Sequence, residues 1–97
     1  MTELEAHDAL VRANEAARLL GEPLLVNALN AQRADVYHKI ESSRWYQRRA
    51  RESLYQQLVA INNFEAQLKE HINSGKLAKS WLDQFRANKE LQRQRKR

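Results

Sequence analysis

The hydrophobic pattern of the chain is organised around residues 44–74, a segment without glycine or proline. Its apolar residues recur in steps of three and four, which is the spacing of one face of a helix and not of a strand. These positions are Ala50, Leu54, Leu58, Ile61, Phe64, Leu68 and Ile72. A long helix with a single apolar stripe needs another helix beside it, from the same chain or from a second copy.

The preceding segment, 23–41, is predicted to supply such a helix. One side of it is apolar and carries Leu25, Leu29, Val36 and Ile40, broadened by Leu24, Ala28 and Tyr37. Ser42 and Ser43 provide a short polar connection, and short connections favour antiparallel neighbours. The two segments are therefore expected to form an antiparallel, coiled-coil-like helical hairpin. In an alternative interpretation, residues 44–49 form an ordered loop and the second helix of the pair begins near Ala50.

A short N-terminal helix is expected to begin near Glu3, because Thr2 and Glu5 have the spacing of a capping box. Its narrow apolar stripe is rich in alanine, which permits close approach to a neighbouring helix. The stripe consists of Leu10, Ala13, Ala17 and Leu20, with Ala6 and Ala16. Gly21 and Pro23 are typical of a helix end followed by the first turn of the next helix.

Gly75 is expected to break or bend the long helix. Beyond it, Leu77, Ala78, Trp81, Leu82 and Phe85 recur at helical spacing and predict a short C-terminal helix. The expected fold is thus all-α, with a helical hairpin flanked by two short helices. We expect residues 1–85 to form one helical domain and residues 86–97 a flexible tail. Because a chain of 97 residues has a thin core, oligomerisation is expected as well.

The net charge of +5 comes from the C-terminal tail. Residues 1–85 contain eleven Lys or Arg and eleven Asp or Glu, whereas residues 86–97 contain six basic residues and Glu90. Within the neutral part, four arginines lie close together, at positions 44, 48, 49 and 51. Attraction to an anionic partner is therefore expected at these two places.

Catalytic chemistry has little support in the sequence. There is no cysteine, and His7, His38 and His71 are not at metal-ligand spacing. With two glycines the chain has no phosphate-binding glycine loop. We therefore expect no enzyme activity, no catalytic residue, no cofactor and no metal. No apolar run is long enough for a membrane span, so no membrane partner is expected and the expected location is the cytoplasm.

Trp45 and Tyr46 lie among the clustered arginines and have two interpretations. In the first, guanidinium groups bind the phosphates of a nucleic acid while the aromatic rings stack on its bases or sugars. The candidate residues are Arg44, Arg48, Arg49 and Arg51, with Arg93, Arg95, Lys96 and Arg97 of the tail. In the second, Trp45 packs over the end of the hairpin and the arginines remain in water or pair with Glu41 and Glu52. The tail itself could bind nucleic acid, fold on an acidic protein surface, or serve as a solubilising end.

Protein contacts are expected on the apolar faces. The candidate residues are Trp81, Leu82 and Phe85 near the C-terminus, with Leu54, Leu58 and Ile61 on the long helix. Each set can equally belong to the core of the chain. Where such a cluster is exposed, it is a natural docking surface.

Several of these residues resemble a pattern found in small helical proteins encoded in the head-gene clusters of tailed bacteriophages and prophages. The matching residues are Pro23-Leu24-Leu25, Arg51-Glu52, Leu54-Tyr55, Leu58, Leu68 and Gly75-Lys76-Leu77-Ala78. The similarity covers about residues 17–82. The connector at 43–46 lacks the proline and aspartate of the pattern. The resemblance implies an accessory protein of a phage particle or of its DNA-packaging machinery, and it implies no catalytic residue.

Three functions follow as hypotheses. The first is a viral structural or assembly accessory that self-associates and binds a head or packaging protein. The second is a DNA-binding accessory, for packaging or regulation, that uses the arginine cluster and the tail. The third is a small phage inhibitor of a host system, with a host protein as its partner.

Overall fold

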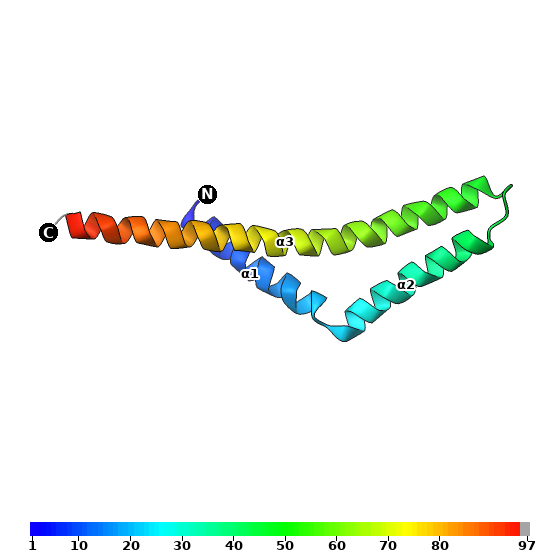
Figure 1. The fold of residues 1–97 in the computed structure, drawn as a ribbon, viewed down its shortest axis with the longest axis horizontal. Helices are drawn as coiled ribbons and strands as arrows, with labels where there is room; N and C mark the ends of the chain where they lie inside the picture. The colour runs from blue at the N-terminus through cyan, green and yellow to red at the C-terminus, as the bar shows by residue number, and fades with distance from the viewer. Residues whose placement is uncertain (96–97) are drawn as a thin grey trace. The chain divides into compact units, whose positions relative to one another are not determined.

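The computed structural model describes residues 1–95, which form three helices and no strand (Figure 1). Helix α1 covers Glu3–Leu20, α2 covers Pro23–Ser42 and α3 covers Arg48–Arg95. The prediction of an all-helical fold is confirmed. The chain divides into two compact units. Unit 1 contains Met1–Ala17 and the part of α3 from Lys69 onward, and unit 2 contains Arg18–Leu68.

The predicted helix ends at the start of the chain are confirmed. The backbone N–H of Glu5 donates to Thr2 Oγ1 at 3.1 Å, and the N–H of Thr2 donates to a Glu5 carboxylate oxygen at 3.3 Å. This reciprocal pair is the capping box that the sequence indicates. Gly21 and Glu22 separate α1 from α2, and Pro23 is in the first turn of α2 as expected.

The expected helix break at Gly75 is wrong. Gly75 is buried inside α3, its φ is not positive, and no separate short helix follows it. The residue is small for a packing reason, because a Cβ at Gly75 would overlap the Cβ of Ala13. The same position would be 3.7 Å from the carbonyl oxygen of Ala9. The backbones of α1 and α3 thus approach closely here, and packing outweighs the weak helix propensity of glycine.

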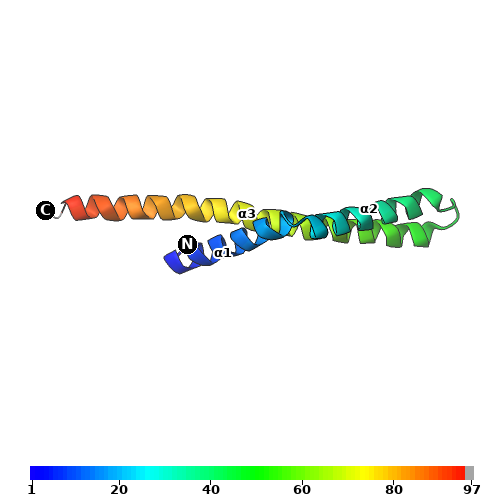
Figure 2. The same cartoon turned by 90° about the horizontal axis from the view of Figure 1, so that it is seen from below.

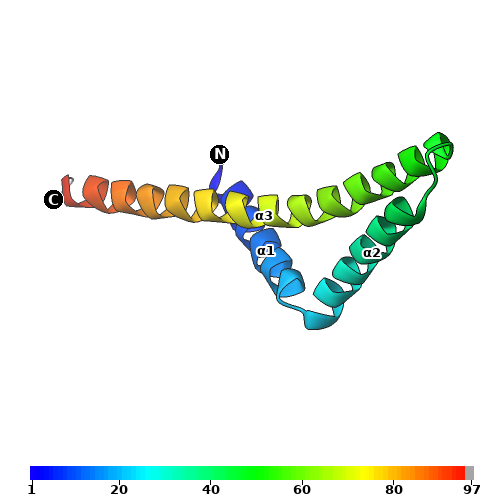
Figure 3. The same ribbon diagram turned by 45° about the vertical axis from the view of Figure 1, so that its right-hand side comes forward.

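The core of unit 1 is built from small side chains. Ala6 and Ala9 of α1 pack with Ala78 and Leu82 of α3, and Leu10 and Trp81 close this cluster at its edge. Ala13 and Ala16 are also buried. The expected alanine stripe of α1 is therefore correct at these positions, but Ala17 is exposed and Ala9 is buried in addition. Figures 1 and 3 show α1 beside the yellow and orange part of α3.

In unit 2, α2 and the first part of α3 are joined by a loop at residues 43–47 (Figure 2). Arg33 of α2 is hydrogen-bonded to Asn62 of α3 at 3.0 Å and forms an ion pair with Glu65. Val36 is the one buried apolar residue of α2. Away from the loop the two helices diverge toward the start of α2 (Figures 1 and 3).

The least exposed residues of α3 in unit 2 differ slightly from the expected stripe. They recur in alternating steps of three and four, which is the spacing of a coiled coil. They are Arg51, Leu54, Leu58, Ile61, Glu65 and Leu68, and each is half-buried. The expected stripe included Phe64, which is 46% exposed, instead of Glu65. On α2, Leu24, Ala28 and Tyr37 are exposed and do not broaden the packed face.

Candidate functional site

The loop that joins α2 to α3 is closed by hydrogen bonds at its base. Ser43 Oγ donates to the carbonyl of Ile40 at 2.6 Å, and Arg51 Nε donates to Ser43 Oγ at 2.8 Å. Within the loop, the N–H of Arg44 donates to the side-chain oxygen of Gln47 at 3.0 Å, and the N–H of Gln47 donates to the carbonyl of Arg44 at 2.9 Å. The backbone that carries Trp45 and Tyr46 is therefore held between two cross-links.

The two aromatic side chains of this loop project into solvent. Trp45 is 84% exposed and Tyr46 is 59% exposed. Their ring centroids lie 5.8 Å apart at an interplanar angle of 86°, an edge-to-face arrangement. The interpretation in which Trp45 packs over the end of the hairpin is therefore wrong, because its side chain is largely uncovered.

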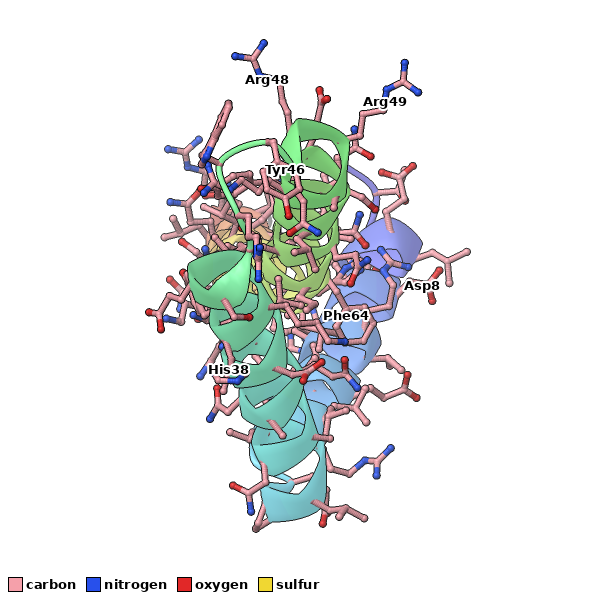
Figure 4. All side chains as sticks on the ribbon, turned by 90° about the vertical axis from the view of Figure 1, so that its right-hand side faces the viewer. Asp8, His38, Tyr46, Arg48, Arg49 and Phe64 are labelled. Atoms are coloured by element: carbon pink, nitrogen blue, oxygen red, sulfur yellow. The ribbon has the colours of Figure 1, made fainter. Side chains whose placement is uncertain are left out.

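Three of the four clustered arginines are exposed as well. Arg44, Arg48 and Arg49 are exposed, whereas Arg51 is half-buried and directs its guanidinium to Ser43. Figure 4 shows the side chains of Arg48 and Arg49 pointing away from the helix near Tyr46. Among the described residues, no ion pair joins these arginines to Glu41 or Glu52. We call Arg44, Trp45, Tyr46, Arg48 and Arg49 the loop cluster.

A second aromatic group lies on α3 in unit 1. The Trp81 and Phe85 rings are stacked, with centroids 5.2 Å apart and an interplanar angle of 12°. Lys89 Nζ lies 5.2 Å from the centroid of Phe85. Both rings are half-buried, whereas Leu82, the third predicted contact residue of this region, is buried in the core with α1.

Two exposed leucines extend this aromatic group, and neither is among the contact residues predicted from the sequence. Leu77 is 70% exposed and Leu91 is 56% exposed. In a helix with 3.6 residues per turn, Leu77, Trp81, Phe85 and Leu91 lie along one side. We call these four residues the α3 stripe. The helical spacing from Leu77 to Phe85 is visible in the sequence, whereas Leu91 lies in the segment predicted to be a flexible tail.

The remaining predicted contact residues, Leu54, Leu58 and Ile61, are half-buried in unit 2. Arg93 and Arg95 of the tail are exposed in the last turn of α3. The structure does not separate residues 86–95 from this helix, while the expected flexibility of the tail stays a prediction. Lys96 and Arg97 lie outside the described residues.

The three histidines lie on the surface of the described chain. His7, His38 and His71 are all exposed, and His38 is labelled on α2 in Figure 4. No group of three or more His, Cys, Asp or Glu side chains in the described part of the chain is arranged to hold a metal ion. None of the described helices has the length and apolar character needed to cross a membrane.

Comparisons with protein-family models, with curated proteins and with solved structures find no match. The resemblance to phage head-gene proteins therefore rests on the sequence residues quoted for it, and the candidate surfaces are argued from their geometry.

Proposed function

We propose that this protein is a non-enzymatic assembly accessory that self-associates through its helices and binds a protein of a phage head or DNA-packaging machine. The phage context comes from the sequence resemblance. Self-association and protein binding are supported by the apolar surface that the described chain leaves exposed. The location that follows is the host cytoplasm or the virion.

The arrangement that we propose for unit 2 is an antiparallel hairpin. Two contacts support it, because the residue nearer the start of α2 contacts the residue farther along α3. Ser43 at the end of α2 contacts Arg51, near the start of α3. Arg33, ten residues earlier than Ser43, contacts Glu65, fourteen residues later than Arg51. In a parallel pair, a contact that lies later on one helix would also lie later on the other helix.

The observation that carries self-association is how few side chains are buried within each unit. In unit 2, from Arg18 to Leu68, Val36 is the one buried side chain, and the apolar residues on the packed face of α3 are half-buried. Among the described residues of unit 1, the buried side chains are alanines and Leu82. The large apolar side chains therefore remain partly in water, and packing against a second copy would bury them.

Unit 2 is where we expect a second copy to pack. Leu54, Leu58 and Ile61 are half-buried although they lie on the face of α3 that carries the contacts to α2. A leucine side chain gains about 1.5–3 kcal/mol from full burial. Further helices against this face would complete the burial of these three residues. The alternating spacing of three and four is compatible with such a bundle.

The partner protein is expected to bind the α3 stripe in unit 1. Trp81 and Phe85 provide a stacked aromatic centre, and Lys89 lies beside it as a polar rim. Aromatic centres with polar rims are typical of protein interfaces. Leu82, which was predicted to take part, contributes by fixing this part of α3 on α1.

The experiment is a binding assay between the purified full chain and individual phage head, portal and terminase proteins. Leu91→Glu places a charge on the α3 stripe without touching the core, and Gln94→Glu adds the same charge nearby as the control. We expect one of these proteins to bind the parent and the control, and to bind Leu91→Glu at least tenfold more weakly. Absence of binding to every component would contradict the proposed partner, while equal binding by Leu91→Glu would contradict the proposed surface.

A further inference from the structure

The loop cluster has features that an assembly helix does not need. An exposed tryptophan and an exposed tyrosine lie in a five-residue loop, with Arg44 before them and Arg48 and Arg49 after them. Residues 44–51 carry four arginines and no acidic residue. We propose that the loop cluster binds single-stranded nucleic acid, with Trp45 and Tyr46 stacking on bases and Arg44, Arg48 and Arg49 contacting phosphates.

The geometry of the two rings is suited to stacking. Because the Trp45 and Tyr46 planes are nearly perpendicular, at 86°, their contact occupies one ring face and leaves others open. Trp45 is 84% exposed, so a base can approach the indole without displacing other side chains. Base–aromatic stacking tolerates any sequence, since every base has a π-face.

The arginines are also available for a polyanion. Arg51 is tied to Ser43 at the base of the loop and therefore acts in positioning. Arg44, Arg48 and Arg49 are exposed, and no ion pair joins them to Glu41 or Glu52. Each nucleotide of a single strand presents a phosphate and a base within a few ångströms, which matches the interleaving of cations and rings in the loop.

A membrane surface is less suited to this cluster. Lipid binding scales with buried apolar area, and in residues 43–49 this area is confined to the rings of Trp45 and Tyr46. In duplex DNA the bases are already stacked on one another, so the two rings would contribute little and phosphate contacts alone would remain. An acidic protein surface offers carboxylates for the arginines and no regular series of π-faces.

The test is fluorescence titration of the full chain with an oligonucleotide of mixed sequence. Trp81→Phe leaves Trp45 as the one tryptophan, so that quenching of its emission reports stacking at the loop. We expect the single strand to bind at low salt and to quench this emission, and to bind more tightly than duplex DNA of the same length. Poly-glutamate and anionic phospholipid vesicles serve as the competing anionic partners.

Two sets of variants separate the contributions. Trp45→Ala is expected to weaken single-strand binding by about 5- to 160-fold. Arg48→Gln with Arg49→Gln is expected to reduce the slope of log K against log salt by about 1.4, since each lost phosphate contact on a single strand accounts for about 0.7. Arg12→Gln with Arg18→Gln removes the same charge from exposed positions of α1 and should leave binding within about twofold.

Several results would overturn the proposal. They are absence of binding at low salt, equal affinity for single strand, duplex and poly-glutamate, and quenching by vesicles without quenching by the oligonucleotide. Equal loss of binding in the α1 control would also overturn it, because it would reduce the effect to net charge. Circular dichroism of each variant confirms that the helices are retained. None of these outcomes depends on the assembly partner.

Discussion

Gly75 lies so close to Ala13 that a Cβ on the glycine would overlap the Cβ of the alanine. This contact fixes α1 against α3 in unit 1 and gives the glycine a packing role. Ala78 and Leu82 continue the same contact with Ala6 and Ala9. Unit 1 is thus stabilised by close backbone approach more than by large side chains.

Gly75→Ala tests this packing role. The substitution should lower the stability of the protein if Gly75 packs against Ala13, and raise it if Gly75 is an ordinary helix residue. In a free helix the substitution would stabilise by about 1 kcal/mol through helix propensity. Against Ala13 the added methyl group must push the helices apart, and overpacking costs about 1–3 kcal/mol. We expect lower stability in urea unfolding followed by circular dichroism. Ser74→Ala, at the exposed neighbouring position, is the control and should not destabilise; a stabilised Gly75→Ala variant would contradict the packing role.

Leu82→Ala is expected to destabilise the protein by about 2–5 kcal/mol, the usual cost of removing a buried leucine side chain. Leu82 is 3% exposed, whereas Leu77 on the same helix is 70% exposed. Leu77→Ala is therefore the matched control and should change the free energy of unfolding by less than about 0.5 kcal/mol. Thermal and urea unfolding measure the stability of both variants. Similar losses in the two variants would show that the core of unit 1 is wrongly assigned.

Arg33→Met removes the polar contacts that join α2 to α3. The Arg33 guanidinium is hydrogen-bonded to Asn30 at 2.9 Å and to Asn62 at 3.0 Å, and it pairs with Glu65. The side chains of Arg33 and Glu65 are 21% and 30% exposed, so the pair is partly shielded from water. We expect the free energy of unfolding to fall by roughly 1–2 kcal/mol, because hydrogen bonds to charged groups contribute more to stability than hydrogen bonds between neutral groups.

The comparison for Arg33→Met is Lys39→Met. This second variant removes the exposed pair of Lys39 and Asp35, at 3.0 Å. Exposed pairs at this helical spacing contribute about 0.3–0.5 kcal/mol. Urea unfolding should therefore show a larger loss of stability for Arg33→Met than for Lys39→Met. If Arg33→Met is as stable as Lys39→Met, the Arg33 contacts do not hold the two helices together.

Local sequence signals were sufficient to predict the first two helices. Thr2 and Glu5 form the expected capping box, and Pro23 is in the first turn of α2. Such signals depend on neighbours in the chain, so no tertiary information is needed. The alternative start of α3 near Ala50 was also close to the observed start at Arg48.

The errors concern residues whose role depends on distant neighbours. Position 75 has room for a glycine alone because of Ala13, sixty-two residues earlier, and no local rule contains that contact. Phe64 was preferred over Glu65 for the packed face because it is apolar. Glu65 is accommodated there because Arg33 pairs with it. For Trp45 the sequence leaves open both a covered and an exposed side chain, and the structure has it exposed.

Sedimentation equilibrium of the full chain, from low to high micromolar concentration, tests self-association most directly. We expect the parent to approach at least the mass of a dimer. Leu58→Asp should dissociate or unfold the protein, because it places an unpaired charge among half-buried leucines. Gln56→Asp adds the same charge at an exposed position and should assemble like the parent. A parent that sediments as a monomer at every concentration would contradict the account.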